Sequence, residues 1–278
     1  RRQVVLPPFH HNPTAVGPTP DGMYLLFYIG ADQTHTQIDC ASHGVPMQCN
    51  RSMNFCRGSH KPASNGHVVM AYSKAPEGPW TEKVILPYNS TPHQTDWNCA
   101  NNNPTAQILS NGTIVLVFRA NACVNDASGG EALGVAVARA WSAPFVRRDG
   151  GPIVSPANNT GNHEDPFVWQ DARGNWHIVS HCQSANNVCG SREAGDGCGA
   201  HLFSTDSFEW HVSRTPVYTP NITLSNGTKV TLGTRQRPQL VFSDDGSMRP
   251  LFLFNGVGHG PNEDLTQLTH TIGFRFNH

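Results

Sequence analysis

The stretch HEDPFVWQDARGNWHIVSH, residues 163–181, shows the unit from which this chain is built. A polar residue stands before a proline, a short apolar segment follows, and a turn at Gly174 leads into a second apolar segment. Proline is tolerated at the first residue of a strand, where no ladder hydrogen bond is lost. Glycine supplies the backbone freedom that a tight turn requires. The stretch therefore predicts a β-hairpin whose first strand starts beside Asp165.

The same arrangement occurs three more times, in the same phase. The units begin at Asn12, Asn103, Asp165 and Arg237, and their turn glycines are Gly22, Gly112, Gly174 and Gly246. Asp-Gly and Asn-Gly pairs in three of these turns are strong hairpin signals. The strands after the turns are almost continuously apolar, as expected where both faces of a sheet are covered. Four such units indicate a repeat architecture.

Each hairpin is followed by a third strand and an outer strand. The third strands are expected near residues 67–74, 133–140, 200–206 and 270–276. Residues 131–143 favour a helix by propensity, but their place in the unit predicts a strand. Four-stranded units repeated in one chain are typical of an all-β fold, the β-propeller. A β-sandwich is the alternative, although it does not explain the shared phase of the four units.

We interpret residues 1–278 as one propeller domain with a Cys-rich insertion at about residues 30–66. Residues 1–8, RRQVVLPP, are typical of an outer strand that closes the ring against the C-terminal strands. The chain contains 26 glycines and 21 prolines, which favour turns over long helices. Its formal net charge of −1 offers no basic surface for nucleic acid. No apolar run is long enough to span a membrane, and the N-terminus is not a signal peptide.

Cysteines and glycosylation sequons together predict a secreted, extracellular glycoprotein. The eight cysteines, an even number, are Cys40, Cys49, Cys56, Cys99, Cys123, Cys182, Cys189 and Cys198. The six N-x-S/T sequons are at Asn50, Asn89, Asn111, Asn158, Asn221 and Asn226. Exported proteins keep disulfides, so all eight cysteines are predicted to pair. A zinc site at Cys182, Cys189 and Cys198 is the alternative, but no C-x₂-C pair supports it.

The repeat resembles the five-bladed β-propeller glycosidases: glycoside hydrolase family 43, arabinanases, levansucrases and invertases. The most specific piece is EDPFVWQDARGNWHIVSH at residues 164–181; HVVMAYSKAPEGPW (67–80) and HLFSTDSFEW (201–210) are similar to their third strands. The resemblance implies a fifth blade, upstream of Arg1 or irregular. It also implies three carboxylates at the channel mouth: a general base in the first blade, a carboxylate that tunes the acid in a middle blade, and a glutamate proton donor in the next.

Carried over residue by residue, the resemblance implies a degenerate catalytic site. Asp165 matches the tuning carboxylate, but Asn12 stands where the base is expected, and Gln236 and Arg237 stand near the expected acid. An amide cannot take a proton from water, so weak or absent hydrolysis is expected. The candidate catalytic residues are Asp165, Glu164 and Glu263, with Asp96 and Asp264 as further substitutes. If another blade precedes Arg1, the base is expected there.

The candidate ligand-binding residues are Asn12, Asn103, His163, Arg235 and Arg237. His10, His11, His181 and His259 also lie near the ends of units, where histidines commonly satisfy backbone groups. Arg235 and Arg237 are compatible with an acidic sugar or with a structural ion pair to Asp165. No cofactor is predicted, and the polar channel is compatible with a calcium ion.

Three functions follow from these observations. The first is a glycan-binding or structural extracellular glycoprotein with weak or no hydrolase activity. The second is an active glycosidase on extracellular polysaccharide. The third is a propeller that binds extracellular proteins or assembles with itself. Fold alone does not decide among them.

Overall fold

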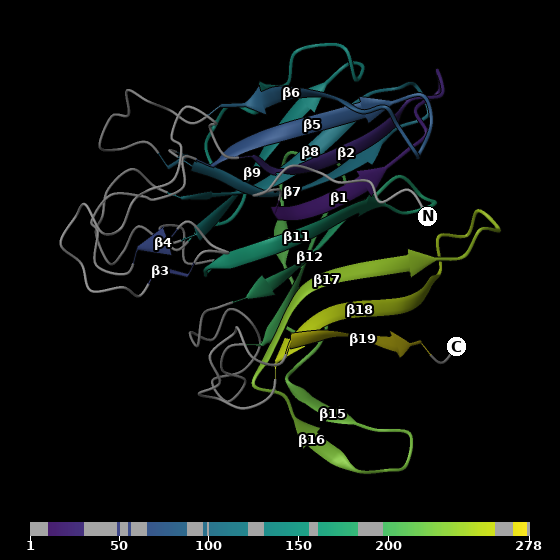
Figure 1. The fold of residues 1–278 in the computed structure, drawn as a ribbon. Helices are drawn as coiled ribbons and strands as arrows, with labels where there is room; N and C mark the ends of the chain where they lie inside the picture. Colours follow the sequence, from purple (N-terminus) through teal and green to yellow (C-terminus); the bar gives the residue numbers. More distant parts are fainter. Residues whose placement is uncertain are drawn as a thin grey trace.

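The computed structural model describes residues 11–30, 49–50, 55–56, 66–87, 97–98, 100–121, 131–155, 161–182, 197–258 and 269–276. These residues form a β-propeller of four blades and, within the described ranges, no helix (Figure 1). Accordingly, no described helix is long and apolar enough to cross a membrane. The predicted all-β propeller is confirmed.

Each of the first three blades is a four-stranded antiparallel sheet. The first blade contains β1 (His11–Val16), β2 (Tyr24–Gly30), β5 (His67–Ser73) and β6 (Thr81–Leu86). The second contains β7 (Ala100–Ile108), β8 (Ile114–Asn121), β9 (Glu131–Ala138) and β10 (Val146–Arg147). The third contains β11 (His163–Gln170), β12 (Trp176–Cys182), β13 (Cys198–Ser204) and β14 (His211–Val212). The strand predicted for residues 131–143 is therefore found, as β9.

The fourth blade has three described strands, β17 (Thr234–Phe242), β18 (Pro250–Gly258) and β19 (Thr269–Arg275). Two small hairpins lie outside the blades: β3 (Cys49–Asn50) with β4 (Phe55–Cys56), and β15 (Asn221–Thr223) with β16 (Lys229–Thr231). The second of these is the surface hairpin at the bottom of Figure 1. A fifth blade is not seen among the described residues, and the strand predicted for residues 1–8 falls outside them.

A β-bulge interrupts the innermost strand of every blade at the repeated position. The register of β7 against β8, for example, shifts between Asn102 and Thr105, and β1, β11 and β17 shift at the matching points. The residue before each proline has a positive φ: 49° at Asn12, 43° at Asn103, 48° at Asp165 and 53° at Arg237. The four sequence units are thus equivalent in backbone geometry as well as in pattern.

Apolar side chains fill the spaces between neighbouring blades. Phe27 and Met70 of the first blade pack with Leu116 and Phe118 of the second. A matching cluster joins the second and third blades, and a smaller one joins the third and fourth through Val179, Tyr218 and Leu253. Strand β8 is buried on both faces because a blade lies on each side of it, which explains its nearly continuous apolar sequence.

Polar contacts also join the innermost strands. The Thr14 hydroxyl donates to the Pro104 carbonyl at 3.0 Å, which links β1 to β7. The Val168 amide donates to the Thr105 hydroxyl at 3.3 Å, which links β11 to β7. These contacts hold the bulged ends of neighbouring strands together, and the site described next lies at those bulges.

Candidate functional site

Four side chains meet where the bulges of the innermost strands converge, and we call them the axial ring: Asn12, Asn103, Asp165 and Arg237. The Asn12 amide donates to Asp165 Oδ1 at 3.1 Å, and the Asn103 amide donates to the same oxygen at 2.7 Å. Arg237 Nε lies 3.8 Å from Asp165 Oδ2. The predicted juxtaposition of these four residues, one from each blade, is therefore found in the structure.

Asp165 is the centre of the axial ring and is only 7% exposed. Burial raises the pKa of its carboxyl to about 6, and the neighbouring Glu164 carboxylate acts in the same direction. Arg237 opposes both effects. The carboxyl therefore changes its charge in a mildly acidic range rather than near pH 4.

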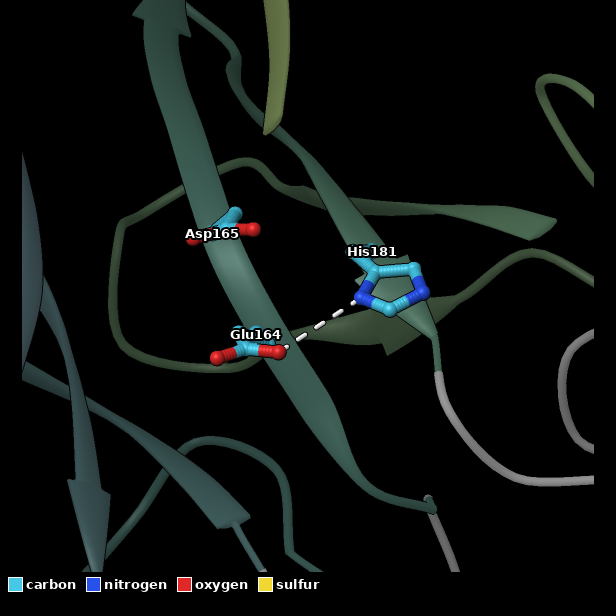
Figure 2. Close-up of side chains that lie close together, drawn as sticks. All are labelled: Glu164, Asp165 and His181. Atoms are coloured by element: carbon cyan, nitrogen blue, oxygen red, sulfur yellow. Dashed lines mark ion pairs between the residues drawn. The ribbon is translucent and has the colours of Figure 1, made fainter. Parts of the chain in front are cut away.

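Beside the axial ring lies a second group of ionisable side chains, which we call the acidic network: Arg119, Glu131, Glu164 and His181. Arg119 Nη1 contacts Glu131 Oε1 at 2.9 Å and also contacts Glu164 Oε1. His181 Nδ1 lies 3.6 Å from Glu164 Oε2. Figure 2 shows Glu164 and Asp165 as neighbours on β11, with His181 reaching toward Glu164 from the adjacent β12.

Glu131 and Arg119 belong to the site but were not predicted from the sequence. Each is a lone charged residue in an apolar strand, Glu131 at the start of β9 and Arg119 near the end of β8. In the sequence, an isolated charge of this kind indicates that a partner lies nearby in the fold, because a charge in a buried strand needs a partner. Burial raises the pKa of Glu131 to about 7 despite Arg119, and Glu164 contributes to the rise. Among the described residues, Glu131 therefore joins Glu164 and Asp165 where the blades converge.

Metal binding is a further possibility for Glu164, Asp165 and His181, whose ligand atoms lie within 4.8 Å of one another. Calcium requires six to eight oxygen ligands, and this group offers two carboxylates and one ring nitrogen. Glu164 also contacts the Arg119 guanidinium, whose positive charge opposes a cation at the same carboxylate. These three ligand atoms do not by themselves complete a calcium shell, and the calcium ion that the sequence left open stays a prediction.

Two predicted ligand-binding residues are buried in the structure. Arg235 is 5% exposed, and its guanidinium lies between the Tyr218 and Phe274 rings, 4.5 Å and 4.0 Å from their centroids. Its guanidinium therefore neither faces a ligand nor forms the ion pair with Asp165 that was the alternative. His163 is fully buried, with Nδ1 2.8 Å from the Ser180 hydroxyl. Both side chains point into the blade packing in this structure, and their ligand-binding assignments stay predictions.

Several other candidates cannot be placed. Glu263, Asp96, Asp264, His10 and His259 lie outside the described residues, and only the backbone of His11 is described. His181 is fully buried in the acidic network. The catalytic assignments of Glu164 and Asp165 stay predictions, although the structure places both at the convergence of the blades.

The cysteine prediction is corrected at one position. Cys198 is a buried free thiol, whereas Cys182, directly opposite it in the β12–β13 register, is disulfide-bonded. The other cysteines lie outside the described residues or are described by backbone only, so their pairing stays a prediction. Among the sequons, Asn111, Asn221 and Asn226 are described and exposed; Asn50 is described by backbone only, and Asn89 and Asn158 fall outside.

Comparison with known proteins identifies the architecture. No protein-family model matches the chain, and no curated protein sequence is similar to it. Among solved structures, the β-xylosidase RS223 superimposes with a TM-score of 0.59 at 14% identity, over 97% of this chain and 76% of the other. A compost-metagenome family 43 β-xylosidase/α-arabinofuranosidase, CoXyl43, gives 0.56 at 14% identity, over 98% and 76%.

A family 117 glycoside hydrolase from Zobellia galactanivorans gives a TM-score of 0.51 at 13% identity, over 94% of this chain and 58% of the other. The chain thus has the β-propeller fold found in glycoside hydrolases of families 43 and 117; the sequence resemblance implied this fold through family 43 and did not include family 117. At these identities the likeness shows the fold alone, and the function depends on the side chains of this chain.

Proposed function

We propose that the chain binds a glycan at the axial ring. The observation that carries this proposal is the convergence of two amides, a carboxylate and a guanidinium from four separate blades at one point. Such groups donate and accept hydrogen bonds in the pattern that sugar hydroxyls require. Two of the similar structures, CoXyl43 and a family 43 enzyme from Xanthomonas citri, were solved with xylotriose.

Hydrolysis by the route that the resemblance implies is expected to be weak. The axial ring contains one carboxylate, and its Oδ1 already accepts two amide hydrogen bonds. Asn12 cannot act as a general base, and Arg237 cannot act as a general acid at ordinary pH. Loss of a proton-transfer group commonly lowers the rate 10²–10⁴-fold.

Glycoside hydrolysis is the second candidate, and one observation favours it. Glu131 and Glu164 contact the same nitrogen of Arg119, so their Oε1 atoms lie no more than about 5 Å apart. Carboxyl pairs at roughly 5–10 Å serve glycoside hydrolysis in other proteins. A hydrolysis screen on plant and algal polysaccharides separates the two functions: robust turnover that is lost in Asp165→Asn would establish the hydrolase.

Replacing Asn103 with alanine is expected to weaken glycan binding by about 10-fold or more. The substitution removes the shortest hydrogen bond that orients the Asp165 carboxylate, so the ring loses part of the fixed arrangement with which it is proposed to meet the glycan. Isothermal titration with a panel of soluble oligosaccharides measures the change. Gln107→Ala is the matched control, since Gln107 is an amide on the same strand, β7, bonded only locally to Ile108. Equal affinities for the two variants would contradict binding at the ring.

The chain is also proposed to be a secreted glycoprotein. The described sequons at Asn111, Asn221 and Asn226 lie in exposed positions that can accept a glycan. Protein isolated from its native source should lose mass when treated with an N-glycosidase, and peptide mapping should find glycan on the 221–231 hairpin. An unchanged mass would refute the argument for secretion. Binding of extracellular proteins and self-assembly stay predictions.

A further inference from the structure

Arg237 is the member of the axial ring whose residue type does not favour its backbone conformation. Its φ of 53° lies in the left-handed region, and Pro238 follows it. Asparagine and aspartate, which occupy the three equivalent positions, tolerate this conformation best among non-glycine residues. Arginine does not share that preference. Strained backbone of this kind persists where the surroundings enforce it, and it is concentrated at functional sites.

Solvent exposure separates Arg237 from the other two arginines near it. Arg119 is occupied by Glu131 and Glu164, and Arg235 is buried between two aromatic rings. Arg237 is ion-paired with Asp165, its Nε 3.8 Å from Oδ2, but its side chain stays 49% exposed. It therefore presents a guanidinium at the axial ring that solvent, and hence a ligand, can reach.

A rigid scaffold sets the position of Arg237. Asn255, only 1% exposed, accepts a hydrogen bond from Arg235 Nε at 3.0 Å and donates one to the Gln236 carbonyl at 3.2 Å. Arg235 Nη1 donates to the Thr219 carbonyl at 2.9 Å. The residues that lead into Arg237 are thus fixed from both β18 and the preceding loop. A binding group held on such a support loses little freedom when a ligand arrives.

We propose that the glycan bound at the axial ring is acidic, and that Arg237 binds its carboxylate or sulfate group. This inference rests on the proposed glycan-binding function and names the class of glycan. Arginine matches the geometry of carboxylate and sulfate oxygens, with which it forms paired, charge-assisted hydrogen bonds.

Asp165 sets the pH range of this interaction. Its carboxylate competes with an anionic ligand for Arg237, and it is faced by Glu164 on β11, His181 on β12, Arg119 on β8 and the asparagines of β1 and β7. Burial holds its pKa above the ordinary value, so mild acid removes the competing charge. Binding of an acidic glycan should therefore strengthen as the pH falls from 8 toward 5.

The test compares three oligosaccharides of equal length by isothermal titration at pH 6: an oligogalacturonate, a sulfated galactan fragment and a neutral galactan fragment. Wild type is expected to bind at least one acidic oligosaccharide about 10-fold more tightly than the neutral one. Arg237→Gln should abolish that preference, and Arg237→Lys should keep part of it because the charge remains. Arg173→Gln, an 81% exposed arginine in the β11–β12 turn, is the matched control and should bind like wild type.

The outcomes separate this inference from the function on which it depends. The acidic class is wrong if wild type binds the neutral and acidic fragments equally, or if Arg237→Gln retains the preference while its thermal unfolding matches wild type. Binding of none of the three would overturn the glycan-binding function as well. A preference for only the carboxylate or only the sulfate fragment supports the inference and identifies which group Arg237 binds.

Discussion

Replacing Arg119 with methionine is expected to lower the free energy of unfolding by about 3–5 kcal/mol at pH 8. Arg119 is 16% exposed and contacts Glu131 and Glu164, which are 19% and 18% exposed. Methionine has a similar length but no charge, so both carboxylates lose their shared cation in a poorly solvated place. Breaking a buried ion pair from one side costs far more than the pair contributes, because the remaining charge has no partner.

Urea denaturation of wild type and variant measures this effect. Arg173→Met is the matched control, since Arg173 pairs with Asp171 but is 81% exposed, and such surface pairs contribute at most about 1 kcal/mol. A triple variant with Glu131→Gln and Glu164→Gln beside Arg119→Met should recover much of the loss, because no carboxylate then lacks a cation. If Arg119→Met and Arg173→Met lose equal stability, the acidic network does not hold the second and third blades together.

The four repeated units were predictable because each is marked by residues that obey local rules, although the resemblance implied a fifth blade as well. A proline after a polar residue, an apolar strand and a turn glycine recur in phase, and each corresponds to a backbone feature of the structure. The phase alone placed Asn12, Asn103, Asp165 and Arg237 on one ring. Equivalent positions in repeated blades must occupy equivalent places around the axis, so no knowledge of side-chain contacts was needed.

The acidic network was not predictable by the same reasoning. Arg119 and Glu131 come from the second and third strands of the second blade, and Glu164 comes from the third blade. Their contact depends on how far each strand extends beyond the bulge and on the angle between blades. Neither quantity is a local property of the sequence. A lone charge in an apolar strand signals that a partner exists, but it does not identify the partner.

The burial of His163 and Arg235, which the sequence did not indicate, has a common physical origin. Each is two residues before the ring residue of its blade, so each was placed at the same mouth. On a strand, successive side chains alternate between faces, and the bulge at the ring disturbs that alternation. His163 consequently turns toward Ser180, and Arg235 turns between Tyr218 and Phe274. A side chain two residues from a ring residue therefore does not have to face the ring.

Replacing Asp165 with asparagine is expected to change the pH dependence of stability. Burial raises the folded-state pKa of Asp165 to about 6, with Glu164 adding to the rise, against an unfolded value near 4. A carboxyl with a raised pKa stabilises the fold fully only below its unfolded pKa, and that contribution is lost as the pH rises through the folded pKa. Wild type should therefore lose about 1–3 kcal/mol between pH 4 and pH 8 that the variant keeps.

The variant retains an oxygen at the position that accepts from Asn12 and Asn103, so the hydrogen bonds of the axial ring can persist. Thermal and urea unfolding across the pH range give the difference between variant and wild type. Asp245→Asn provides a control of opposite sign, because hydrogen bonds from Ser247 and Ser243 hold the pKa of Asp245 below its ordinary value. If the free energies of unfolding of Asp165→Asn and wild type change in parallel with pH, the ionised Asp165 carboxylate does not destabilise the fold. If wild type loses stability relative to the variant as the pH rises, the fold bears a destabilising carboxylate where four blades meet. A binding site has this arrangement, whereas a stabilising core does not.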